Sequence, residues 1–219
     1  VSQVGYMVLG IGTGTPIGIA GGLFHMLNNS IYKTGLFLSA GTVEHRAGTD
    51  EIDKLGGLAG RMPLTFFAFL VCSLAIAGVP PLNGFVSKWM VYQGIIDVGQ
   101  EGNRLFPVFL TAAMLGSVLT LASFLKLLHA VFLGGRPANL DKVREGGFEM
   151  WLPTTILAVL CIGFGVFAYW LPLQNLIYPA LPFGVRPFGI WQPELTTILM
   201  LIGMGVGAVL YLFGTARKP

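Results

Sequence analysis

Charged residues are scarce in this sequence. Only 11% of its 219 residues are Asp, Glu, Lys or Arg, whereas soluble domains carry about 25%. Hydrophobic residues make up 54% of the chain, and its mean hydropathy is +0.74. This deficit of charge excludes an ordinary soluble domain, and the net charge of +3 is too small and too scattered to indicate a nucleic-acid partner. We therefore predict an all-α, polytopic integral membrane protein.

Cysteine and the motifs of soluble enzymes are also nearly absent. The two cysteines, Cys72 and Cys161, lie inside apolar runs, where they are expected to be small buried side chains rather than a disulfide or metal site. The GIGTG at 10–14 lacks the full glycine spacing and the βαβ context of a dinucleotide fingerprint. The sequence contains no CxxC pair and no plausible nucleophile triad. We expect no cofactor, no metal and no bond-making chemistry in this chain.

Long apolar runs predict seven helices. They span about 1–12, 17–42, 63–79, 81–98, 105–133, 151–171 and 194–213. The first is too short to cross a bilayer, so we expect the chain to begin inside a helix, as a fragment of a longer subunit; the alternative is that the upstream half is a separate polypeptide. Proline removes a backbone donor, so GVPPLNG (78–84) predicts a break or re-entrant start in the fourth helix. In lipid, such a break needs protein or water to receive the freed backbone groups.

Aromatic residues and loop charges are guides to topology. Aromatic side chains cluster near the ends of the last two predicted spans, as expected at membrane interfaces: Trp151, Tyr169, Trp170, Trp191 and Tyr211. Lys and Arg are balanced between alternate loops, so charge does not orient the chain. The remaining ionisable groups of the 42–61 loop, including His45, are expected to be ordinary solvated side chains.

Four polar side chains lie deep inside the second predicted helix: His25, Asn28, Asn29 and Lys33. Residues four apart share a helix face, so His25, Asn29 and Lys33 line one side and Asn28 lies beside His25. No Asp or Glu occurs in the first 40 residues to pair with the lysine. A charged lysine at bilayer depth is costly and by default marks an ion path. The alternative is a lysine that snorkels to the interface or has a structural partner.

Three further polar residues are weaker candidates. Lys88 lies about two turns after the proline pair, where exposed backbone groups and water build midplane ion sites in transporters; the alternative is an interfacial lysine stacked near Trp89. Lys126 and His129 are three apart and lie on one face of the fifth helix. They are close enough to its end to reach the interface, so an accessory role and simple snorkelling remain equally open.

Two stretches carry a family resemblance. FHMLNNSIYKTGLFLSAG (24–41), followed by a charged loop and PLTFFAFLVCSLAIAGVPPLNGFVSKW (63–89), resembles the antiporter-like membrane subunits. The opening SQVGYMVLG looks like the start of a helix in that family. Its members serve respiratory complex I, multisubunit cation/proton antiporters and membrane-bound hydrogenases. The resemblance is specific over about residues 1–135. The sequence around Lys88 is more similar to the hydrogenase and cation-antiporter branches than to the NADH-oxidising branch.

The resemblance implies an architecture. Residues 1–133 would form the second five-helix inverted repeat of such a subunit, including a broken helix. Residues 134–150 would be a charged connecting loop, and 151–219 would add two further transmembrane helices.

The resemblance also implies roles for individual residues. Lys33 would be the central lysine of a proton half-channel, and His25 would precede it on the same helix. Lys88 would be the terminal residue that exchanges protons with the far side of the membrane. Asn29 stands where many relatives carry a second histidine, so it can orient water but cannot titrate.

The expected function is proton translocation by a non-catalytic subunit of a redox-driven or antiporter complex. The host would resemble an NADH–quinone oxidoreductase or a hydrogenase, in a prokaryotic cytoplasmic membrane or an equivalent energy-transducing membrane. Energy would arrive from other membrane subunits, including the missing N-terminal half or neighbouring antiporter-like subunits. One alternative is Na⁺ or K⁺/H⁺ antiport, although these segments contain almost none of the carboxylates that hard cations prefer. Another is a structural or quinone-site membrane anchor without a proton path.

Overall fold

The computed structural model describes residues 1–185, and their regular structure is entirely helical, as predicted. The α-helices are α1 (Ser2–Gly12), α2 (Pro16–Ala47), α3 (Pro63–Ala77), α4 (Asn83–Gln100), α5 (Phe106–Leu128) and α6 (Phe148–Val166). Shorter helical segments are Ile52–Lys54, His129–Leu133, Ala138–Leu140, Tyr169–Ile177 and Tyr178–Ala180. The helix predicted at 194–213, with Trp191 and Tyr211, lies outside the described residues.

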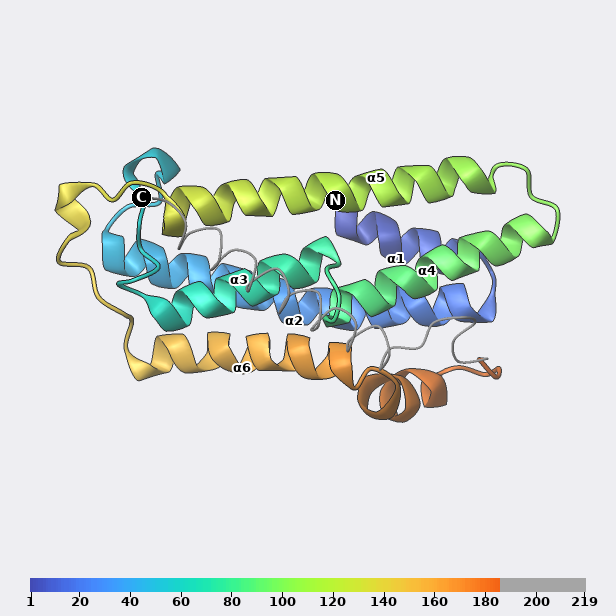
Figure 1. Ribbon diagram of the computed structural model, residues 1–219. Helices are drawn as coiled ribbons and strands as arrows, with labels where there is room; N and C mark the ends of the chain where they lie inside the picture. Colours follow the sequence, from blue (N-terminus) through green and yellow to red (C-terminus); the bar gives the residue numbers. More distant parts are fainter. Residues whose placement is uncertain (186–219) are drawn as a thin grey trace, which may run out of the picture.

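Long and short helices are combined in one bundle (Figure 1). α2 has 32 residues, which corresponds to about 48 Å of rise, and α5 with its π-helical continuation has 28 residues. α1, α3 and α4 are shorter, and α3 and α4 follow one another along the length of α2. The N-terminus of α1, the C-terminus of α3 and the N-terminus of α4 therefore lie near the middle of the bundle.

α2 begins where predicted and ends later than predicted. Pro16 occupies the first turn, and the side chain of Thr15 accepts a hydrogen bond from the Gly18 amide. The helix continues to Ala47 and is capped by Gly48 with φ +73°, the left-handed conformation that glycine supplies. His45 is therefore exposed in the last helical turn, and its placement in a loop was wrong. Basic side chains are favourable at this negative end of the helix dipole.

The proline pair lies between helices. α3 ends at Ala77 and α4 begins at Asn83, so Pro80 and Pro81 occupy the connecting turn, and both predicted boundaries shift by about two residues. α6 ends at Val166 rather than near 171, and a π-helical segment from Tyr169 to Ile177 follows it.

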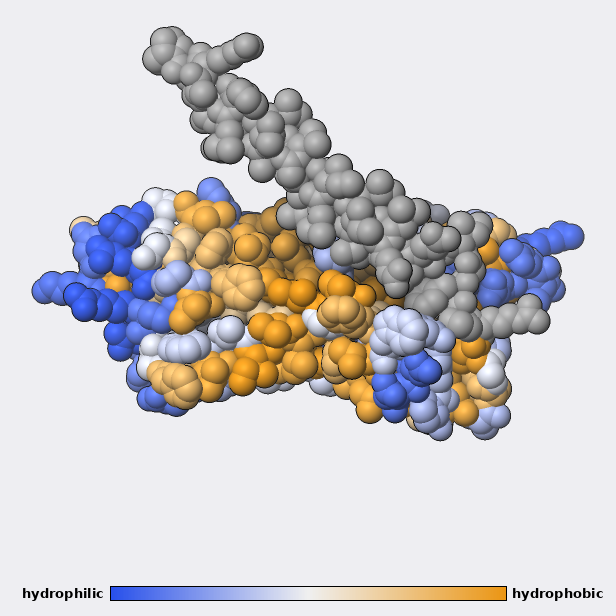
Figure 2. Space-filling model, turned by 60° about the horizontal axis from the view of Figure 1, so that its bottom comes forward, coloured by the Kyte–Doolittle hydropathy of each residue, from blue (hydrophilic) through white to orange (hydrophobic). Residues whose placement is uncertain are grey.

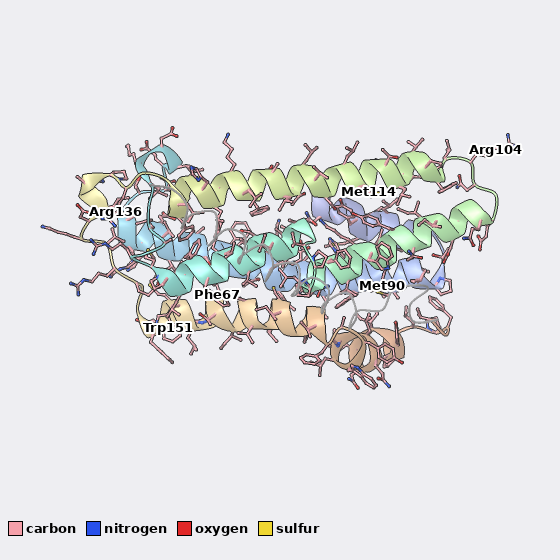
Figure 3. All side chains as sticks on the ribbon, in the orientation of Figure 1. Phe67, Met90, Arg104, Met114, Arg136 and Trp151 are labelled. Carbon is pink, nitrogen blue, oxygen red and sulfur yellow. The ribbon has the colours of Figure 1, made fainter. Side chains whose placement is uncertain are left out.

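The middle of the bundle is apolar on the face seen in Figure 2. Figure 2 shows an apolar band between polar ends, and Figure 3 shows Arg104 and Arg136 at opposite ends with Met114 on α5 between them. Two helices in the described part of the chain are long and apolar enough to cross a membrane: Phe106–Leu133 and Phe148–Val166. α2 and α4 carry polar side chains in their middles, and α3 is shorter.

α2 is the central element, and α1, α3, α4 and α6 pack against it. It approaches α4 so closely that a β-carbon added to Gly94 would lie 2.5 Å from the Gly18 Cα. Small residues allow membrane helices this close approach. The packing brings the polar residues of α2 and α4 into contact near the end of α3.

Candidate functional site

The ammonium group of Lys88 lies on the C-terminal end of α3. The residue is 2% exposed, and Nζ donates hydrogen bonds to the carbonyl oxygens of Ile76 (3.0 Å) and Ala77 (3.1 Å). The last carbonyls of a helix lack intrahelical donors and carry partial negative charge. These backbone groups replace a carboxylate, because no acidic side chain within residues 1–185 forms an ion pair with Lys88.

Gly78 makes room for this lysine. It ends α3 with φ +85°, a conformation that residues with a side chain rarely adopt. A β-carbon at this position would lie 2.9 Å from Lys88 Cδ. The glycine therefore serves both the turn and the contact between the lysine stem and the helix end.

His25 is fully buried beside α4 and α1. Its Nδ1 lies 2.9 Å from Ser87 Oγ, and its Nε2 lies 3.1 Å from Gln3 Oε1 and 3.4 Å from the Tyr32 hydroxyl. An amide oxygen can only accept, so Nε2 carries a proton in this arrangement and a neutral ring accepts from Ser87 at Nδ1. The imidazole thus links α1, α2 and α4 through side chains alone.

Asn28 joins α2 to the first residue of α4. Its Nδ2 donates to the Asn83 carbonyl oxygen (2.9 Å), and Asn83 Nδ2 donates back to Asn28 Oδ1 (3.0 Å). Both residues are fully buried. The reciprocal pair fixes the start of α4 against α2, one turn before Ser87 and Lys88.

Lys33 lies near the middle of α2 and lines a cavity of about 460 Å³ together with Asn29. The other polar side chains that line it come from α1 and α5: Ser2, Gln3, Thr120 and Ser123. In this chain Lys33 is exposed, with Nζ 5.9 Å from the Phe37 ring centroid, so the structure encloses Lys88 but not Lys33. The Asn29 Oδ1 atom is buried and has no hydrogen-bond partner.

The cavity is adjacent to both buried groups. Gln3 lines it and also contacts His25 Nε2. Ile76 lines it and also supplies a carbonyl to Lys88. One residue therefore separates the cavity from His25, and one separates it from Lys88.

Lys126 and His129 are not brought into this site. Both are exposed at the end of α5 and the start of the following π-helical segment. Among the described residues, those that line the Lys33 cavity include neither of them. Their accessory role remains a prediction.

Sequence reasoning missed several members of the site: Gln3, Tyr32, Asn83, Ser87, and Tyr6, whose ring centroid lies 4.6 Å from Lys88 Nζ. All are neutral and lie far along the chain from the residues that they contact, apart from Tyr32. Gln3 gave the clearest signal, because it is an amide inside an apolar run at the start of α1. Their roles follow from contacts between helices and not from spacing within one.

Comparison with known proteins identifies the family. Residues 1–120 match the family described as NADH:quinone oxidoreductase/Mrp antiporter, TM. The chain belongs to this family. The resemblance predicted from the motifs at 24–41 and 63–89 is confirmed, and with it the expectation of an integral membrane subunit.

Individual relatives agree with this assignment. The chain is 32% identical over 218 residues to Formate hydrogenlyase subunit 3 of Escherichia coli (strain K12), with 91% of this chain and 36% of the relative covered. It is 36% identical over 210 residues to a Na(+)/H(+) antiporter subunit of Bacillus subtilis (strain 168), with 87% and 26% covered. The chain thus spans between about a quarter and just over a third of the length of these NADH:quinone oxidoreductase/Mrp antiporter relatives.

A solved structure shares the fold. A chain of the membrane-bound sulfane sulfur reductase, an archaeal respiratory membrane complex, superposes with a TM-score of 0.81 at 30% identity, covering 99% of this chain and 36% of the other. Members of the family are therefore found as subunits of multisubunit membrane complexes.

Proposed function

We propose that this chain conducts protons as part of an antiporter-type subunit in a multisubunit membrane complex. The host membrane would be a prokaryotic cytoplasmic membrane or an equivalent energy-transducing one. The observation that carries the proposal is the placement of Lys88. It is a buried lysine with backbone carbonyls as its hydrogen-bond acceptors, one residue away from a cavity that is lined in part by polar side chains and includes a second lysine.

The proposed path begins at Lys33 in the cavity. A proton passes from there along water oriented by the unpartnered Oδ1 of Asn29, and reaches His25, whose Nδ1 is the ring nitrogen free to accept it. His25 and Lys88 both contact Tyr6, with ring centroids 5.5 Å apart for His25 and Nζ 4.6 Å from the ring centroid for Lys88. Lys88 is the terminal carrier and releases its proton toward the far side. Asn28 holds α4 in register, so that these groups stay aligned.

The energetics allow Lys88 to change its protonation state. A charged lysine at the bilayer centre costs at least about 2.5–3.5 kcal/mol. A hydrogen bond to a charged group contributes about 1.5–3 kcal/mol, and a desolvated cation–π contact contributes about 2 kcal/mol. The two hydrogen bonds and the ring contact together contribute about 5–8 kcal/mol, which exceeds this minimum cost but lies below the upper value of about 10–17 kcal/mol for a charged arginine at this depth, so neither the charged nor the neutral lysine is locked in place.

The proposal also covers the architecture. α3 and α4 would be the two halves of one broken membrane-spanning helix, with the break at 78–82 providing the free carbonyls that bind Lys88. Residues 1–133 would form the second five-helix repeat, 134–150 its connecting loop and 151–219 the C-terminal helices. Energy would come from other membrane subunits of the complex.

Substitution of Lys88 by Met tests the function. Met keeps the length and apolar stem of the side chain and removes the titratable amine. We expect proton uptake by vesicles, energised by the complex's own driving reaction and followed with a pH-sensitive dye, to fall at least tenfold while the complex still assembles. Lys142→Met, a change of an exposed lysine in the 134–150 loop, should stay within twofold of the unmodified complex.

Two outcomes would favour the alternatives. Normal proton uptake by an assembled Lys88→Met complex would indicate a structural or quinone-site anchor and would refute the proposal. One relative is named as part of a Na(+)/H(+) antiporter, so the same vesicles should be assayed with and without Na⁺ and K⁺. If uptake through this chain required one of these cations, antiport would replace simple proton conduction.

A further inference from the structure

Tyr6 occupies the junction between the groups of the site. It lies on α1, is 4% exposed, and its ring is close to both the His25 ring and the Lys88 ammonium. We propose that Tyr6 is a positioning residue: its ring holds the protonated Lys88 on the end of α3 and closes the space between Lys88 and the Lys33 cavity. This inference rests on the proposed function and adds to it the residue that controls Lys88.

The Tyr6 ring lies where the Lys88 ammonium group has no carbonyl acceptor. An ammonium group has three donors, and the carbonyls of Ile76 and Ala77 take two of them. The Tyr6 ring centroid lies 4.6 Å from Nζ, within the range of a cation–π contact. Such a contact attracts the charged amine and not the neutral one. Loss of the proton therefore weakens the hold of the ring at the moment when the lysine must move.

The ring itself is fixed from the side of α5. The Tyr6 hydroxyl donates to the Ala113 carbonyl oxygen and contacts Ser117 Oγ at 2.8 Å. A β-carbon added to Gly116 would lie 3.0 Å from this hydroxyl, tighter than an ordinary contact. The absence of a side chain at 116 gives the tyrosine its place, and the hydroxyl anchors the ring over Lys88.

Tyr6 lies behind residues that line the cavity. Gly116, where an added β-carbon would lie 3.0 Å from the Tyr6 hydroxyl, lines the cavity, and so does Gln3, one turn before Tyr6 on α1. Ile76 lines it from α3 while its carbonyl binds Lys88. The tyrosine ring and the α3 end therefore separate Lys88 from the space that Lys33 occupies. Movement of this ring would join the two.

Three variants of the assembled complex test the inference. Tyr6→Leu removes the ring face and the packing behind the cavity lining, Tyr6→Phe keeps the ring and loses only the hydroxyl, and Tyr92→Leu removes a neighbouring tyrosine that shares Ser117. The readouts in membrane vesicles are energised proton uptake and the passive proton leak without the driving reaction. We expect Tyr6→Leu to lower uptake at least fivefold and to raise the leak at least threefold. Tyr6→Phe should restore uptake to at least half, and Tyr92→Leu should stay within twofold on both readouts.

The result that overturns the inference is uptake and leak in Tyr6→Leu that match the unmodified complex, or a loss in Tyr6→Phe as large as in Tyr6→Leu. If Tyr6→Leu does not assemble, Gly116→Ala pushes the hydroxyl and the ring together away from α5 without changing Tyr6; it should lower uptake at least twofold, and an unchanged rate would contradict the inference. The proposed function fails separately. Normal proton uptake by the Lys88→Met complex refutes both proposals. Loss of uptake in Lys88→Met together with normal uptake and leak in Tyr6→Leu refutes only the role of Tyr6.

Discussion

A buried imidazole can serve this site in two ways. His25 can carry a proton, or it can only connect Gln3 to Ser87 through its two ring nitrogens. A buried polar group that loses its partner costs about 1–3 kcal/mol, so removal of the ring disturbs the site in both cases. Only a substitution that keeps a hydrogen bond and abolishes titration separates the two roles.

His25→Asn makes that separation. The asparagine amide reaches the position of Nδ1 and can still bond to Ser87, but it cannot take up a proton. If His25 is a carrier, proton uptake by the assembled complex falls at least tenfold. Ser30→Ala, an exposed change on the same helix, should leave uptake unchanged. Near-normal uptake in His25→Asn would make the histidine a structural connector and would leave the path dependent on water alone.

Among the elements, α3 carries a counter-charge at each end. Lys88 lies at its C-terminus, and at its N-terminus Glu145 accepts hydrogen bonds from the backbone amides of Leu64 (2.8 Å) and Thr65 (3.3 Å). A carboxylate at the first turn and an ammonium at the last both complement the helix dipole. The connecting loop therefore stabilises the short helix whose other end binds the lysine.

Glu145→Ala should destabilise α3. Loss of an N-terminal cap costs about 0.5–2 kcal/mol, so the unfolding midpoint of the purified complex, followed by circular dichroism at 222 nm, should fall. Glu145→Gln keeps one acceptor oxygen and should lose roughly half as much. Glu149→Ala provides the matched control, because this exposed acid lies in the first turn of α6 without a side-chain cap bond. Equal midpoints for Glu145→Ala and Glu149→Ala would show that the cap contributes nothing.

The sequence predicted the elements better than their contacts. Pro16 and Pro63 mark the starts of α2 and α3, and GVPPLNG separates α3 from α4, because proline restricts the backbone locally. The cap from Glu145 and the contact between Tyr6 and Lys88 join residues about 80 positions apart. No local pattern specifies such pairs, so the sequence named Lys88 and His25 but not their partners. The end of α2 was also missed, since its charged last turn resembles a loop.

At the scale of the whole molecule, the lengths of the helices determine where in the bundle the site lies. Two long helices cover the full bundle, and three short ones end near its middle, where their free backbone groups would otherwise face lipid (Figure 1). Backbone groups at such depth must be received by protein or water. The apolar surface between the polar ends (Figure 2) and the polar residues buried inside the bundle are thus two consequences of one arrangement.

A single path through this arrangement predicts a particular pattern among variants. Lys33 lines the cavity, and Lys88 lies behind Ile76, which lines the same cavity, with the Tyr6 ring against its ammonium group. If a proton binds to both lysines in turn, loss of one lysine already blocks the path, and loss of the second should not lower the rate of proton uptake further. Effects of independent sites, in contrast, combine additively in free energy and therefore multiply in rate.

The most direct test is the rate of proton uptake by the assembled complex that carries Lys33→Met and Lys88→Met together, measured beside each single variant. One shared path predicts that the double variant is as slow as the slower single variant and no slower. A rate equal to the product of the two single effects would show that the lysines act in separate processes, and would contradict the account.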